Sequence, residues 1–200
     1  IIFRGYNYNI YNTDIICISD FLLNKYHHYH INWTLSTKKY NIDNLYKDLF
    51  KYLINTKNYK SIIFTGSSAG GYQSIKYACY FNCIALISNC QIYLEKYPLF
   101  ERTQDTIKTT LVSLKSLMKM NNDEVIYRDR NIEKHFYENK PQKIIIYCNK
   151  LDYTYKDHIK PFINFVNDNN LMNLLDITLF EKEIEGIRTH SIQYPDDKNI

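Results

Sequence analysis

The sequence predicts an α/β protein with a mostly parallel central β-sheet and helices on both faces of that sheet. Short apolar runs alternate along the chain with stretches of helical periodicity. The runs are apolar throughout, as in parallel strands that are covered on both sides. Two hundred residues suit a single domain over 1–200, with enough chain to bury a sizeable core.

The elements are predicted from composition and periodicity. Apolar runs predict strands at 1–3, 14–20, 62–64, 83–87, 143–147 and 174–180. Apolar residues at helical spacing predict helices at 42–53, after residue 71 and at 161–167, the first capped by Asn41 or Asp43. Residues 91–140 show no convincing strand and predict a helical insertion, either a cap over an active site or plain connecting helices.

Composition limits the classes of partner. The net charge of +4 is small and dispersed, so it gives no argument for nucleic acid, although an anionic polymer substrate is compatible with it. No apolar run approaches the ~20 residues of a membrane span. The chain begins with Ile inside a predicted strand, so we expect a segment upstream, and a targeting signal there stays open.

Cysteine and histidine patterns do not predict a metal site. The five cysteines contain no C-x-x-C pair and mostly lie in or beside apolar elements, which indicates buried thiols in a reducing, cytoplasmic compartment. A peripheral position at the inner membrane face is the alternative. His27, His28 and His30 are close in sequence but lack a carboxylate or Cys at ligand spacing. We therefore expect neither a metal nor a tightly bound cofactor.

Residues 61–81 contain the most informative motif. An apolar strand is followed by Gly66-x-Ser68-x-Gly70 and then by a helical stretch. G-x-S-x-G in this context predicts a nucleophile elbow, in which a strained turn exposes the serine. Gly66 and Gly70 are expected to be small because backbone passes close to both. A P-loop would need Lys-Ser/Thr after the glycines, and a dinucleotide fingerprint would need G-x-G-x-x-G; neither is present. A purely structural turn remains the alternative.

Three side chains that follow predicted strands form a candidate catalytic triad. Ser68, Asp152 and His190 occur in the order nucleophile, acid, base, which is that of the α/β-hydrolase type of fold. His190 would accept the Ser68 proton, and Asp152 would orient the imidazole. The Ala69 N–H is one expected oxyanion donor, and the loop near Tyr6 supplies the second.

Each triad partner has rivals. Asp157 and Asp176 compete with Asp152, although the first is predicted on a helix and the second in or beside a strand. His158 and His135 compete with His190, but His135 precedes the acid in the chain. Ser67 lies outside the centre of the motif.

The chain resembles a group of bacterial α/β-hydrolase-like proteins of surface-polysaccharide loci. The residues that carry the resemblance are FTGSSAGG, Asn89-Cys90-Gln91 and Tyr97, together with Asp152 and His190. Cys90 stands where the family more usually has Pro. The group is similar to the capsule O-acetyltransferase of serogroup A meningococci and, more distantly, to an accessory protein of serine-rich adhesin export.

The resemblance implies serine-dependent acyl transfer to a carbohydrate through an acyl-enzyme. The expected activity is that of an O-acetyltransferase or O-acetyl esterase acting on a surface or capsular polysaccharide. It implies acetyl-CoA as donor, and Asn89 and Gln91 as substrate-binding residues. A small-ester carboxylesterase is one alternative, and a catalytically silent scaffold in glycan export is another. The sequence does not indicate the oligomeric state.

Overall fold

A computed structural model describes residues 14–20, 33–36, 40–96 and 131–183. Its strands form one parallel sheet in the order β1 (Ile63–Ser68), β2 (Ile84–Cys90), β3 (Lys143–Asn149), β4 (Leu175–Phe180). The α-helices are α2 (Ile42–Asn55), α3 (Ala69–Phe81), α6 (Ile132–Glu138) and α7 (Lys160–Asp168). Shorter helical segments are η1 (Leu94–Lys96), η3 (Tyr155–Ile159) and η4 (Met172–Leu174).

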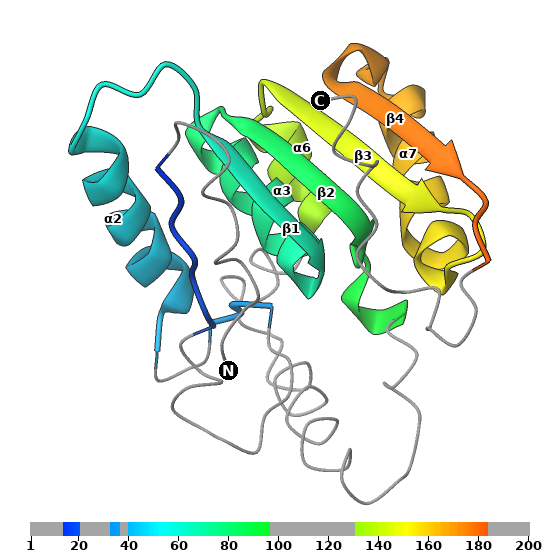
Figure 1. Cartoon of the computed structure of the whole chain (residues 1–200), viewed down its shortest axis with the longest axis horizontal. Coiled ribbons are helices and arrows are strands. Elements are labelled where there is room, and N and C mark those ends of the chain that lie inside the picture. Colours follow the sequence, from blue (N-terminus) through cyan, green and yellow to red (C-terminus); the bar gives the residue numbers. More distant parts are fainter. Residues whose placement is uncertain (1–13, 21–32, 37–39, 97–130, 184–200) are drawn as a thin grey trace, which may run out of the picture.

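The order in which the chain forms the strands decides on which face of the sheet the connecting helices lie. Spatial and sequence order of the strands agree, so every right-handed crossover turns toward the same face. Figure 1 shows α3, α6 and α7 together behind the sheet. Because the strands are parallel, their carboxyl ends lie next to one another along one border of the sheet, which we call the carboxyl-end edge. The predicted parallel α/β sheet is confirmed. Helices on the second face stay a prediction, because no described helix covers it.

The main core lies between the sheet and these helices. Alternate strand residues such as Ala85, Ile87, Ile144 and Ile146 are fully buried there. Each large apolar side chain buried in this way contributes about 1.5–3 kcal/mol. Ile63 points to the opposite face and is 54% exposed. The strands therefore show two distinct faces within the described structure.

One sequence prediction needs correction. Residues 14–20 form no strand, although the run is apolar, and their first four residues are exposed. An apolar run alone does not provide the ladder partners that define a strand.

The predicted insertion 91–140 is described only in part. Ile132 and Phe136 of α6 pack within the main core, as in a connecting helix, and a cap over the site stays a prediction. The middle of that stretch and the predicted strand at 1–3 lie outside the described residues.

Helix α2 packs against α3 beyond the β1 edge of the sheet (Figure 1). Its predicted cap is confirmed, because Asn41 Oδ1 accepts a hydrogen bond from the Asn44 N–H at 3.0 Å. Phe50 of α2 meets Phe64 and Tyr77, with ring centroids 5.1 and 4.8 Å apart. This aromatic contact joins α2 to the helix that follows Ser68.

A buried lysine lies at the same contact. The Lys76 side chain is 1% exposed, and its Nζ lies 3.0 Å from Asp43 Oδ1. The other carboxylate oxygen of Asp43 bonds to Lys47. Burial lowers the pKa of Lys76 to about 8, while the negative charge of Asp43 opposes that shift. The charge of Lys76 in the folded protein therefore changes at mildly alkaline pH.

We predict that the contribution of Lys76 to stability grows as the pH rises from 8 to 9.5. Its folded-state pKa of about 8 lies below the ~10.4 of an unfolded lysine, so the unfolded chain binds more protons in this window. Buried thiols such as Cys79 and Cys148 have raised pKa values and lower the total stability in the same window. The Lys76 contribution is therefore the difference in the free energy of urea unfolding between the parent and Lys76→Met, which should grow by about 1.5 kcal/mol across the window. The difference between the parent and Lys60→Met, a matched change at an exposed lysine, should not depend on pH in this way. Equal slopes in the parent and Lys76→Met would contradict the prediction.

Candidate active site

Ser68 lies in a strained turn between β1 and α3. Its backbone has φ 52° and ψ −121°, a conformation that costs a non-glycine residue about 1–3 kcal/mol. The strand–turn–helix context predicted for the elbow is confirmed. This context is the one that exposes a serine side chain at the end of a strand.

Two glycines permit the turn through close packing. A Cβ on Gly66 would lie 2.4 Å from the carbonyl carbon of Gly70. A Cβ on Gly71 would lie 2.6 Å from the Cys90 Sγ. The expectation for Gly70 itself was wrong, because a Cβ there meets no described atom within 4 Å. The required small residues are therefore Gly66 and Gly71, and Gly70 contributes only its backbone to the contact.

The end of β2 is adapted to this turn by a bulge. The register passes from Ser67 opposite Ser88 to Ser68 opposite Cys90, so Asn89 is an extra residue. Its φ of 41° is in the left-handed region, which Asn tolerates better than most residues. Beyond the bulge, the Gln91 N–H donates to the Ser68 carbonyl at 3.1 Å. The bulge thus brings Gln91 beside the serine backbone.

The Gln91 side chain connects three segments that are far apart in sequence. Its Oε1 accepts from the Trp33 indole N–H at 2.8 Å, and its Nε2 donates to the Tyr153 hydroxyl at 2.7 Å. Gln91 is 1% exposed. The Asn89 Oδ1 likewise accepts from the Asn149 N–H at 3.0 Å. Both predicted substrate-binding side chains thus have partners within the protein, and substrate contact stays a prediction.

Asp152 follows β3 at the edge where Ser68 lies. It is 2% exposed, and its Oδ1 accepts from the Thr154 N–H at 2.8 Å and from the Thr154 hydroxyl at 2.6 Å. Burial, followed by the negative charge of Asp152, raises the pKa of the Cys148 thiol to about 12. A buried carboxylate with an ordered position can serve as the acid of a triad.

The rival acids and bases lie elsewhere or are otherwise engaged. Asp176 lies near the start of β4, and therefore at the end of the sheet opposite to the carboxyl ends of the strands. Its carboxylate pairs with Lys143 at 3.0 Å. His158 lies in η3, and its Nδ1 accepts the Tyr93 N–H at 3.1 Å. A triad imidazole instead donates from Nδ1 to its carboxylate. Asp157 shares η3, and His135 lies on α6.

Of the remaining predicted site residues, only Ala69 lies within the described structure. Ala69 is the first residue of α3, and the first N–H groups of a helix have no intrahelical partner. Its role as an oxyanion donor stays a prediction. His190, Tyr6 and Tyr97 lie outside the described residues. The described residues therefore bring together the elbow, Asn89, Gln91 and Asp152 at one edge.

Sequence reasoning missed three residues at this edge. Trp33 and Tyr153 hold the Gln91 amide, and Asn149 bonds to several backbone groups. Trp33 and Thr34 both have positive φ, which sequence does not reveal for such residues. The single tryptophan of the chain was the only signal available.

The part of the chain that the structure describes offers no candidate metal site and no candidate membrane span. No group of three His, Cys, Asp or Glu residues there could hold a metal ion. None of the helices described is both long and apolar enough to cross a bilayer.

Comparisons with known proteins identify the fold. No family model matches the chain, and no curated protein matches it in sequence. Its structure is similar to that of FphF, a fluorophosphonate-binding serine hydrolase of Staphylococcus aureus, with a TM-score of 0.50 and 15% identity over 72% of this chain and 56% of that one. It is also similar to S-formylglutathione hydrolase FrmB from Staphylococcus aureus, with a TM-score of 0.52 and 16% identity over 76% and 61% of the two chains. The chain thus spans less than two thirds of the length of these two structures. The similarity confirms the predicted α/β-hydrolase type of fold.

The two motif glycines should respond differently to the same substitution. Gly66→Ala forces a Cβ into the Gly70 backbone and should lower the free energy of unfolding by about 2 kcal/mol or more. Gly70→Ala meets open space within α3 and should be neutral or stabilising by up to about 1 kcal/mol. Thermal unfolding followed by circular dichroism measures both. Equal losses in the two variants would contradict the packing of this turn.

Proposed function

We propose that this protein is a serine-dependent acyl-transfer enzyme with Ser68 as nucleophile. The observation that carries the proposal is the strained backbone of Ser68 between β1 and α3. A strained conformation is retained where the surrounding structure holds it, and such positions cluster at active sites. Asp152, buried and ordered at the same edge, supports the assignment of the acid.

The mechanism follows from the roles of these groups. The Ser68 Oγ attacks the acyl carbon of a donor ester or thioester while His190 accepts its proton. The tetrahedral oxyanion is stabilised by N–H groups at the start of α3, including that of Ala69. The donor alcohol or thiol leaves with the proton from His190. An acceptor hydroxyl or water then attacks the acyl-enzyme, returns its proton through His190 and releases Ser68.

The acyl group and acceptor are proposed from the resemblance to polysaccharide-modifying proteins. Asn89-x-Gln91 is the narrower part of that resemblance, and it supports acetyl transfer to or from a sugar hydroxyl, with acetyl-CoA as donor for the transferase. A small-ester carboxylesterase is the second candidate. It is favoured by the likeness to a fluorophosphonate-binding serine hydrolase and to an S-formylglutathione hydrolase.

Labelling with a fluorophosphonate probe tests the nucleophile. The parent protein should gain one adduct by intact mass, because an activated serine attacks phosphorus as it attacks an acyl carbon. Ser68→Ala should abolish the adduct, and His190→Ala should slow it by about 10²-fold or more. Ser67→Ala is the matched control, because it removes a neighbouring hydroxyl from the same strand, and it should label normally.

Acetyl transfer is then measured with isotopically labelled acetyl-CoA and de-O-acetylated polysaccharide. Label that appears in the polysaccharide and depends on Ser68 supports the transferase. Turnover of p-nitrophenyl acetate with no transfer supports the small-ester esterase. An unlabelled, well-folded parent protein would contradict both enzymatic candidates and favour the silent scaffold.

A further inference from the structure

Asn149 lies at the point where three strands end. It is the last residue of β3 and is fully buried. Its own N–H donates to Asn89 Oδ1 at 3.0 Å, which ties β3 to the bulge of β2. Its carbonyl accepts from the Asp152 N–H at 2.9 Å, which closes the turn that carries the candidate acid.

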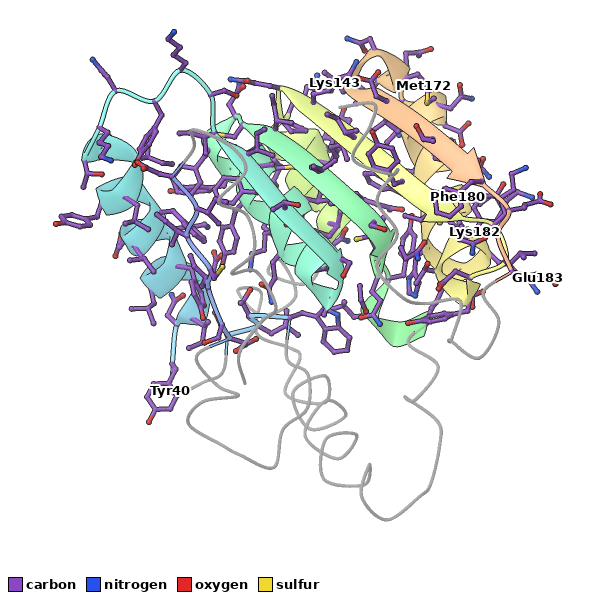
Figure 2. The ribbon with its side chains drawn as sticks, viewed as in Figure 1. Tyr40, Lys143, Met172, Phe180, Lys182 and Glu183 are labelled. Atoms are coloured by element: carbon purple, nitrogen blue, oxygen red, sulfur yellow. The ribbon has the colours of Figure 1, made fainter. Side chains whose placement is uncertain are left out.

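The Asn149 side chain makes three more hydrogen bonds. Its Oδ1 accepts from the Leu151 N–H at 3.1 Å and from the Lys182 N–H at 3.3 Å. Its Nδ2 donates to the Lys182 carbonyl at 2.8 Å. Lys182 follows the last strand, and Figure 2 shows it with Glu183 beyond the end of β4. One amide therefore holds both the acid turn and the exit from β4.

The two segments bonded by the Asn149 side chain contain, or lead to, residues of the candidate triad. The turn after β3 carries Asp152, and the chain that leaves Lys182 reaches His190 eight residues later. The hydrogen bonds to Lys182 fix the position of the chain directly before the stretch that contains His190. The relative position of acid and base in a triad decides how well the carboxylate orients the imidazole.

We propose that Asn149 is a positioning residue that sets the acid turn and the exit of β4 relative to each other. The proposal rests on the proposed function, because it assigns Asp152 and His190 to one triad. Asn149 suits this role better than a charged residue would, since an amide donates and accepts at once and adds no charge beside Asp152. Its side chain is fully buried and bonded to backbone groups, so the role is one of positioning.

The test is the pH profile of fluorophosphonate labelling in the parent and in Asn149→Ala. The variant should label at least about fivefold more slowly at neutral pH. The midpoint at which the rate rises with pH should also move to lower pH, because an imidazolium that loses its carboxylate partner gives up its proton more easily. A residue with only a structural role would not move this midpoint.

Two further variants make the result decisive. Val166→Ala shortens a buried side chain of α7 and lowers stability without touching the strand ends, so its midpoint should equal that of the parent. Asn149→Ser keeps a small polar side chain and adds no charge beside Asp152, but its hydroxyl is too short to bond to both Leu151 and Lys182. It should also label more slowly with a lowered midpoint, and it carries the test if Asn149→Ala does not fold.

The outcomes separate the two proposals. A labelled parent whose rate and midpoint are shared by the Asn149 variants would overturn the role of Asn149 and leave Ser68 as nucleophile. A folded parent that does not label would overturn the proposed function and this role with it. Slower labelling with a lowered midpoint in Asn149→Ala, and an unchanged midpoint in Val166→Ala, is the expected result.

Discussion

A serine held at φ 52° must be kept there by its surroundings, because the relaxed chain would leave that conformation. These surroundings include close backbone contacts. Gly66 lets the Gly70 backbone approach, and the Gln91 N–H holds the Ser68 carbonyl from the neighbouring strand. The bulge at Asn89 makes this last bond reachable. Loss of any of these contacts would let the serine relax into an ordinary helix start.

The order of the strands explains why a single edge collects so many polar groups. Successive parallel strands with crossovers of one hand end at the same edge, so the residues that follow β1, β2, β3 and β4 become neighbours. In open parallel sheets, this carboxyl-end edge is where ligands bind. The N-terminus of α3 opens at the same edge and adds the positive end of its dipole. The gathering of these groups at the carboxyl ends of the strands is therefore largely a consequence of topology.

Local sequence patterns predicted the secondary-structure elements and the elbow. The features they did not predict depend on contacts between residues far apart in the sequence. The elbow, the helix cap at Asn41 and all four described strands follow from periodicity and turn residues. The free space at Gly70 could not be predicted, because it depends on what packs around α3. Trp33 and Gln91 are 58 residues apart, and no spacing rule links them. The burial of Lys76 also depends on a partner from another helix, Asp43.

Three side chains buried at or directly after the ends of β2 and β3 are amides, and their chemistry suits the site: Asn89, Gln91 and Asn149. Gln91 bridges Trp33 and Tyr153, and Asn149 bridges two backbone segments, because an amide donates and accepts at once. A buried ion would pay a desolvation penalty and would need a counter-ion. It would also shift the protonation of any nearby titrating group. These bridges are neutral, so they add no charge of their own where Asp152 is buried. In the proposed triad, an amide such as Asn149 would therefore act on the charge interaction of Asp152 only through the position of that carboxylate.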